Sequence, residues 1–197
     1  MKKIKELLVG TNNEGKYREI CNLLPKKVKK YSPKEFGILT PDENGKSFKK
    51  NSYIKASYFS KKTNMICLSD DSGLEIDLLN KQPGIYSARW SGKKNDFNLA
   101  IKKVLTKMNM KKKNWENYNG ARFVCCMTIF WPNGKSYSSV GTIRGKISKL
   151  KKGKKGFGYD PNFIPNGHNK TFGEMNIRLK MSIDHRFKSY QKLKKFF

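Results

Sequence analysis

The feature that most restricts the fold lies at the start of the chain, where a short apolar run is followed by a polar turn and a helical pattern. Residues 5–10 (KELLVG) predict a short buried strand. After the turn, apolar side chains recur at the spacing of one helix face, at Tyr17, Ile20, Cys21 and Leu24. Pro25 ends this helix. A strand, a turn and a helix in this order are typical of α/β proteins.

The rest of the chain continues this alternation. A helix is predicted over residues 47–63, and Asp96 can cap another whose apolar face is formed by Ile101, Val104, Leu105 and Met108. Strands are predicted over residues 65–68, 74–79, 122–130 and 135–142. Asn133 and Gly134 suit a tight hairpin turn, and a final helix is predicted from near Ser182. This order predicts an α/β fold with a mixed sheet.

Composition narrows the class of protein further. The 197 residues carry 43 Lys+Arg against 15 Asp+Glu, which gives a net charge of +28, and 37% of them are hydrophobic. This apolar content exceeds that of highly charged disordered chains, so we expect a folded protein. Because the length suits one domain and no linker interrupts the pattern, we predict a single domain over residues 1–197.

Features that the sequence lacks help to predict the cellular location of the protein. No apolar run approaches the roughly 20 residues that a membrane span needs, and the N-terminal residues lack a secretion signal. The cysteines lack the CxxC spacing of zinc sites and predict reduced core thiols, at Cys21, Cys67, Cys125 and Cys126. We therefore expect a cytoplasmic protein that does not bind a membrane.

The basic excess has two interpretations. Clustered basic residues bind phosphate backbones, but only six of the 43 are arginine, the residue that base-reading surfaces favour. The lysines are spread over nearly every segment. We expect a solvated basic surface that attracts polyanions such as nucleoside triphosphates, and no specific nucleic-acid partner. A dedicated nucleic-acid-binding face is the alternative.

Residues 10–16 (GTNNEGK), between the first strand and the first helix, nearly match a phosphate-binding loop. Free backbone N–H groups at the helix start and the charge of Lys16 favour a phosphate. Tyr17 stands where the full motif has the Ser or Thr that binds magnesium, so the P-loop pattern fails. An ordinary loop with a solvated lysine is the alternative.

Asp70 and Asp71 form a pair of adjacent carboxylates after an apolar strand, where α/β proteins commonly place ligand groups. Because two carboxylates repel each other, the pair is suited to holding Mg²⁺ with one while the other orients or deprotonates a water. A turn capped by one aspartate before Gly73 is the alternative.

Two later segments have side chains that suit a nucleotide. Residues 156–161 (GFGYDP) combine a flexible backbone with aromatic rings that can stack on a base, while Asp160 can accept from its edge. A tight turn with core aromatics is equally compatible with this segment. Lys180, His185 and Arg186 lie near the start of the last predicted helix, where facing solvent is the alternative.

In this order, the motifs resemble the inosine triphosphate pyrophosphatase, or Ham1-like, family of house-cleaning nucleotide hydrolases. The family's Thr-x-Asn-x-x-Lys stretch is matched by Thr11, Asn13 and Lys16, and its Asp-Asp-Ser-Gly-Leu stretch by residues 70–74. Further matches are residues 83–89 (PGIYSAR), 156–161, and 170–172 with 174–175, and Ser182 with His185 and Arg186. The resemblance covers essentially the whole chain.

The resemblance implies a fold and an activity. The fold is an ITPase-like (Maf/Ham1-type) elongated mixed β-sheet flanked by helices, with two lobes around a nucleotide cleft, and the protein is a homodimer. The activity is Mg²⁺-dependent hydrolysis of non-standard purine nucleoside triphosphates (ITP, dITP, XTP) to the monophosphate and pyrophosphate.

The same resemblance assigns the site residues. Asp71 is the catalytic base and a metal ligand, and Asp70 supports it as a second metal ligand. Thr11, Asn13, Lys16 and Ser72 hold the phosphates, with Lys180 adding positive charge there, and the same loop supplies further substrate-binding residues, Asn12, Glu14 and Gly15. Phe157 stacks on the purine, and the pocket is completed by Gly158, Tyr159 and Asp160. Donors from His185 and Arg186 favour a 6-keto group over the 6-amino group of adenine.

One position departs from the family. Its Thr/Ser-Phe-x-Glu-Asn motif carries a Glu that contributes to the metal site, and Lys50 occupies that position here. Because an ammonium repels Mg²⁺, metal binding is weakened, or Lys50 contacts phosphate, or hydrolysis is lost. We expect the first, since Mg²⁺ commonly binds through one or two carboxylates plus phosphates and waters. A catalytically impaired nucleotide-binding member and a basic nucleic-acid-binding protein are the alternative functions.

Overall fold

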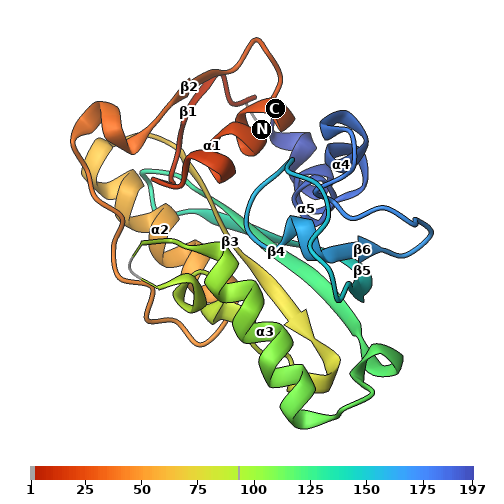
Figure 1. The fold of residues 1–197 in the computed structure, drawn as a ribbon. Coiled ribbons are helices and arrows are strands. Elements are labelled where there is room, and N and C mark those ends of the chain that lie inside the picture. Colours follow the sequence, from red (N-terminus) through yellow and green to blue (C-terminus); the bar gives the residue numbers. More distant parts are fainter. Residues whose placement is uncertain (1–2, 93) are drawn as a thin grey trace. The chain divides into compact units, whose positions relative to one another are not determined.

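The computed structural model describes residues 3–92 and 94–197, and the chain forms two compact units. The first unit comprises Met1–Asp71, Cys125–Gly141 and His185–Phe197, and the second comprises Ser72–Val124 and Thr142–Asp184. Six strands form one sheet in the order β2-β1-β3-β4-β5-β6, with helices flanking it (Figure 1). Its first strands pair in parallel and its last two pair antiparallel, so the predicted mixed α/β class is confirmed.

The first unit contains the predicted strand, turn and helix. Its complete elements are β1 (Glu6–Val9), α1 (Glu14–Leu23), β2 (Lys29–Tyr31), α2 (Phe48–Thr63) and α5 (His185–Leu193). The predicted helix over residues 47–63 is confirmed, with Ser47 as its N-cap. Helices α1 and α5 pack together, and the core they cover includes Leu7, Ile20, Met127 and Leu193. Apolar burial on one face of α1 therefore follows the sequence pattern.

The second unit is built around α3 (Phe97–Lys111), which Asp96 caps by accepting the N–H of Asn98, as predicted. Its other complete elements are β6 (Phe163–Pro165) and α4 (Ile177–Ile183). Ile101, Val104 and Met108 face a core that also holds the rings of Phe163 and Phe172. This core is separate from that of the first unit.

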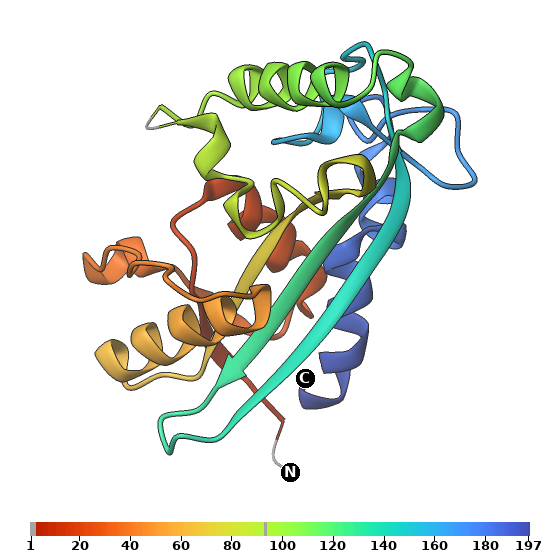
Figure 2. The same ribbon diagram turned by 90° about the horizontal axis from the view of Figure 1, so that it is seen from below.

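Three longer strands have residues in both units: β3 (Cys67–Ile76), β4 (Gly120–Phe130) and β5 (Ser136–Ile147). The predicted hairpin joins β4 and β5 (Figure 2). In its turn, Gly134 has a φ of 86° and donates its N–H to the carbonyl of Trp131 at 2.9 Å. The left-handed backbone of Gly134 explains why glycine stands at this position.

The predicted pair of strands over residues 65–68 and 74–79 is wrong, because β3 is a single strand of ten residues. Asp70 and Asp71 lie within it, so the interpretation of a turn before Gly73 is also wrong. The polar residues do not break the strand because buried cations and hydrogen bonds compensate their side chains. Residues 77–79 form a 3₁₀ turn instead of strand.

The predicted last helix is divided in two. Asp184 is extended (φ −72°, ψ 175°) between α4 and α5, and Ser182 lies inside α4, where its hydroxyl donates to the carbonyl of Leu179. Ile183 packs on the core of the second unit, whereas Tyr190 packs on the core of the first. The two halves of this single apolar stripe therefore pack on two different cores. The two three-residue strands β2 and β6 were not predicted.

Three of the four cysteines, Cys67, Cys125 and Cys126, are buried free thiols, as predicted, while Cys21 is partly exposed. Across residues 3–92 and 94–197, each helix is too short or too polar to cross a membrane.

Candidate active site

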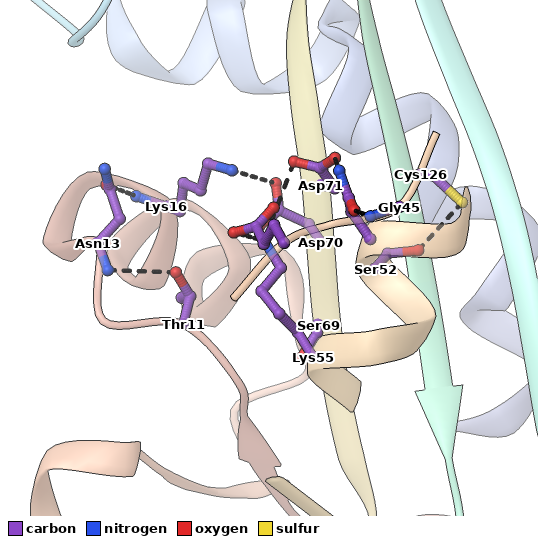
Figure 3. Close-up of polar contacts among 12 residues, drawn as sticks. Thr11, Asn13, Lys16, Gly45, Ser52, Lys55, Ser69, Asp70, Asp71 and Cys126 are labelled. Atoms are coloured by element: carbon purple, nitrogen blue, oxygen red, sulfur yellow. Dashed lines mark hydrogen bonds and ion pairs between the residues drawn. The ribbon is translucent and has the colours of Figure 1, made fainter. Parts of the chain in front are cut away.

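The loop between β1 and α1 is ordered by its own side chains. The Oγ1 of Thr11 accepts the N–H of Asn13 at 3.2 Å, and the Oδ1 of Asn13 accepts the N–H of Lys16 at 3.0 Å (Figure 3). Asn13 is therefore the N-cap of α1. Asn12 donates to the carbonyl of Ile38 at 3.2 Å. These bonds fix the helix start that the sequence predicts as a phosphate site.

The first residue of this loop must be small. A Cβ on Gly10 would lie 2.2 Å from the Oγ of Ser69, so only glycine lets the end of β1 pass this close to β3. Two other loop residues differ in their surroundings. Glu14 is exposed and pairs with Lys34 at 2.7 Å, whereas the ammonium of Lys16 lies 3.6 Å from the Oδ2 of Asp70.

Asp70 is fully buried and lies between two cations. Its Oδ2 is 3.6 Å from the Nζ of Lys16 and 3.4 Å from the Nε of Arg186. Arg186 also pairs with Glu19 of α1 at 2.8 Å, and its Nη1 lies 3.3 Å from the Nε2 of His185. The two cations compensate the charge of Asp70 in the interior, where an isolated carboxylate would be costly.

Asp71 is paired with other residues than Asp70 is. Its Oδ2 accepts a hydrogen bond from the Nδ2 of Asn51 at 3.0 Å, and its Oδ1 lies 3.9 Å from the Nζ of Lys55 (Figure 3). Burial raises the pKa of Asp71 to about 6, against the opposing charges of Lys55 and Lys16. A carboxyl group with this pKa can exchange protons near neutral pH.

Glu43 is a site residue that the sequence analysis missed. Its Oε1 lies 2.9 Å from the buried Nζ of Lys55, so Lys55 is paired with two carboxylates, Glu43 and Asp71. Burial lowers the pKa of Lys55, but these carboxylates and Asp70 raise it by more, which leaves the ammonium charged. A signal was available, because Asp42 and Glu43 are the acidic residues between Glu35 and Asp70 in a lysine-rich stretch.

The carboxylates of this unit are compatible with Mg²⁺. In the described part of the chain, no three His, Cys, Asp or Glu side chains gather as a ready ligand group. Asp71 and Glu43 nevertheless provide two hard oxygen donors beside the same ammonium, and Mg²⁺ commonly takes one or two carboxylates plus waters and phosphates. Because Mg²⁺ binds only the ionised carboxylate, the metal and a proton compete for Asp71, whose pKa burial raises to about 6.

Lys50, the position that departs from the family motif, is exposed on the first turn of α2. Its Nζ lies 5.6 Å from the ring centroid of Tyr53, which itself packs edge-on against Phe130. An exposed ammonium is screened by water and salt, so its repulsion of a cation is weak.

A second set of predicted residues gathers in the second unit. The Oδ2 of Asp160 accepts the N–H of Phe157 at 2.9 Å and pairs with the Nζ of Lys180 at 2.6 Å. This ammonium lies 5.3 Å from the ring centroid of Phe157. The hydroxyl of Tyr159 donates to the carbonyl of Ser87 at 2.9 Å, and its ring is buried.

The structure thus sorts the predicted site residues into two groups. The first unit brings together Thr11, Asn13, Lys16, Asp70, Asp71, His185 and Arg186. The second unit holds Phe157, Gly158, Tyr159, Asp160 and Lys180, and Ser72 begins this unit as a half-buried residue of β3. Lys180, which the sequence analysis placed at the phosphates, is paired with Asp160 of the aromatic loop.

A comparison with known proteins shows which protein family the chain belongs to. The model of the Ham1 family matches residues 7–196. The chain belongs to the Ham1 family. A dITP/XTP pyrophosphatase of Zymomonas mobilis is 39% identical over 188 residues, which cover 95% of this chain and 89% of that protein. A dITP/XTP pyrophosphatase of Caulobacter vibrioides is 36% identical and covers 96% of both chains.

Solved Ham1 structures agree with the fold. A HAM1 protein from Coxiella burnetii has a TM-score of 0.87 and 31% identity, and the match covers 98% of each chain. A nucleoside-triphosphatase described as a dITP/XTP pyrophosphatase, from Mycobacterium abscessus, has a TM-score of 0.73 and 33% identity, covering 95% of this chain and 98% of that one. The Ham1 resemblance inferred from the motifs is therefore confirmed.

Proposed function

We propose that this chain acts as a single domain that hydrolyses non-standard purine nucleoside triphosphates, dITP, ITP and XTP, to the monophosphate and pyrophosphate. The names of its Ham1 relatives support this substrate class. The observation that carries the proposal is Asp71, a buried carboxyl group with a pKa of about 6 that is held between Asn51 and Lys55.

In this proposal, Asp71 acts as the base. The oxygen of a water molecule attacks the α-phosphorus, and Asp71 accepts a proton from that water. The bond from the α-phosphorus to the oxygen that bridges it to the β-phosphorus breaks, and pyrophosphate leaves with the electron pair. Catalysis of such reactions depends mainly on alignment of the reacting groups and on stabilisation of the negative charge of the phosphates. The ordered loop after β1 and its Lys16 can supply both.

Asp71 and Glu43 are the residues that would hold Mg²⁺, with Asp70 as the further ligand that the sequence predicts. When bound, the metal supplies positive charge to the phosphate oxygens and lowers the pKa of a coordinated water. Asp70 also keeps Lys16 and Arg186 in place through its two ion pairs. Lys55 holds the carboxylates of Asp71 and Glu43 on either side of one ammonium.

Binding of the purine base is assigned to Phe157, Tyr159, Asp160, His185 and Arg186. We expect the ring of Phe157 to stack on the base, with Tyr159 and Asp160 shaping the loop that carries it. His185 and Arg186 provide N–H donors, which a 6-keto group accepts and the 6-amino group of adenine cannot. A homodimer in the cytoplasm, implied by the family resemblance, is part of this proposal.

A pyrophosphate-release assay tests the function. The purified protein is supplied with Mg²⁺ and with dITP, ITP, XTP, ATP or GTP in parallel. We expect kcat/KM to be highest for the non-standard purines, and Asp71→Asn to abolish turnover while nucleotide binding remains measurable by calorimetry. Binding of dITP without turnover in the unchanged protein would instead identify the catalytically impaired member of the family.

A further inference from the structure

Asn51 connects the two carboxylates to which the proposed function assigns the metal and the base. It lies on the second turn of α2, and its side chain is completely buried. Both the nitrogen and the oxygen of its side-chain amide form hydrogen bonds. Its Nδ2 donates to the Oδ2 of Asp71 at 3.0 Å, and its Oδ1 accepts the N–H of Gly45 at 2.8 Å. Gly45 is two residues after Glu43, so one side chain contacts both strand β3 and the segment that carries Glu43.

Lys55 forms the second half of this arrangement. It follows Asn51 by four residues, which places both side chains on the same face of α2. Lys55 pairs with Glu43 at 2.9 Å and lies 3.9 Å from the Oδ1 of Asp71. Each oxygen of Asp71 therefore faces a different residue of α2, and each of these residues also contacts the segment from Glu43 to Gly45 (Figure 3).

The backbone of the segment is closely fitted to Asn51. A Cβ on Gly45 would lie 2.5 Å from the Oδ1 of Asn51 and 2.7 Å from the Cγ of Lys50. Any larger residue at position 45 must displace the side chains of Asn51 and Lys50 or the segment itself, and either change disturbs the contact with the Asn51 amide. The absence of a side chain at Gly45 is thus what allows its N–H to reach the amide oxygen.

We propose that Asn51 is a positioning residue that sets the place of Glu43 relative to Asp71. This inference rests on the proposed roles of these two carboxylates. The requirement is for a donor on one end and an acceptor on the other, which the carboxamide of asparagine provides. Leucine has a similar size and neither group. Aspartate can accept from Gly45 but cannot donate to the ionised carboxylate of Asp71, and it repels that carboxylate.

The test compares Asn51→Leu and Asn51→Asp with Asn64→Asp, a matched control at the exposed C-cap of the same helix. Calorimetry measures Mg²⁺ binding without nucleotide, and NMR measures hydrogen exchange at the Gly45 amide. We expect Asn51→Leu to weaken Mg²⁺ binding at least tenfold and to speed exchange at Gly45 at least tenfold. Asn51→Asp should retain slow exchange at Gly45, because it keeps the acceptor. The control should match the unchanged protein.

Kinetics separate positioning from a purely structural role. A positioning role lowers kcat for dITP at least tenfold per folded molecule, as counted from NMR signal intensity, with KM changed less than threefold. Partial unfolding lowers the apparent kcat only in proportion to the folded fraction. If Asn51→Leu does not fold, Gly45→Ala disturbs the contact between the segment and the Asn51 amide while keeping Asn51 and Asp71, and it should weaken Mg²⁺ binding in the same way. Folded Asn51→Leu or Gly45→Ala with unchanged Mg²⁺ affinity would overturn the inference. If the unchanged protein binds Mg²⁺ and shows slow Gly45 exchange but does not hydrolyse dITP, the proposed function fails and the inference stands.

Discussion

Single side chains in the first unit show how a basic chain keeps carboxylates in its interior. Asp70 is compensated by Lys16 and Arg186, while Asp71 shares Lys55 with Glu43. The motif containing Asp70 and Asp71 was evident in the sequence because adjacent aspartates after an apolar run are unusual. The role of Glu43 was not evident in the sequence, because its closeness to Asp71 depends on the path of the loop before α2 and on a buried lysine, Lys55.

Lys50 provides a test of the one departure from the family motif. Because its side chain is exposed and lies over Tyr53, we expect Lys50→Glu to change the Mg²⁺ concentration for half-maximal activity by less than about twofold. The measurement is a magnesium titration at fixed dITP and fixed ionic strength. Lys49→Glu, also exposed at the start of α2, is the matched control. A tenfold fall in the midpoint for Lys50→Glu alone would place the ammonium near the metal.

The carboxyl group of Asp71 makes stability depend on pH in the metal-free protein. Burial raises its pKa from 3.8 to about 6, so the folded state binds more protons than the unfolded state between these values. Stability therefore falls as the pH rises through this interval, by at most about 3 kcal/mol. We expect Asp71→Asn to remove this fall, as measured by urea unfolding in a chelator from pH 4 to pH 8. An unchanged pH dependence in the variant would assign it to other groups.

At the level of elements, the patterns with strong periodicity were predicted best. Helix α1 was predicted with its end at Pro25 and α3 with its cap at Asp96, because an apolar stripe and a nearby Pro or Asp determine them locally. Helix α2 was also predicted, although its apolar stripe is weaker. Strand β3 was divided wrongly, since its polar centre is stabilised by residues distant in sequence. The last helix was joined wrongly, since Asp184 interrupts a stripe whose halves pack on separate cores.

The packing of α5 on β5 depends on one glycine. A Cβ on Gly141 would lie 2.2 Å from the carbonyl oxygen of His185 and 2.3 Å from the backbone N of Ser189. Both contacts are with backbone, so the helix must move. We expect Gly141→Ala to destabilise the protein by about 1–3 kcal/mol, the usual cost of overpacking. Denaturant unfolding measures this, with Ser136→Ala at the exposed start of β5 as control. Equal stability of the two variants would contradict the close packing.

For the whole molecule, the family, the fold class and a division into two lobes followed from the motifs and the resemblance they carry, whereas the residues that form each of the two compact units did not. A single domain was predicted because no linker interrupts the chain, yet β3, β4 and β5 each have residues in both compact units. Continuous strands leave no Pro- or Gly-rich boundary in the sequence, so units that share strands escape a search for linkers. The net charge of +28, in contrast, is a property that the sequence gives directly.

This charge predicts the response of the protein to salt. Like charges repel one another in the compact state, and salt shortens the range of this repulsion from about 10 Å at 0.1 M to about 3 Å at 1 M. We expect thermal stability to rise between low and high NaCl by at least about 1 kcal/mol, which corresponds to about 2–4 °C in Tm. The same screening should lower kcat/KM for the anionic triphosphate, because the attraction of the positive surface for substrate is also lost. A variant in which the exposed Lys26, Lys27, Lys102 and Lys154 are changed to Gln should be more stable at low salt and respond less to NaCl. If the unchanged protein lost stability with added NaCl, specific ion pairs would outweigh the net repulsion.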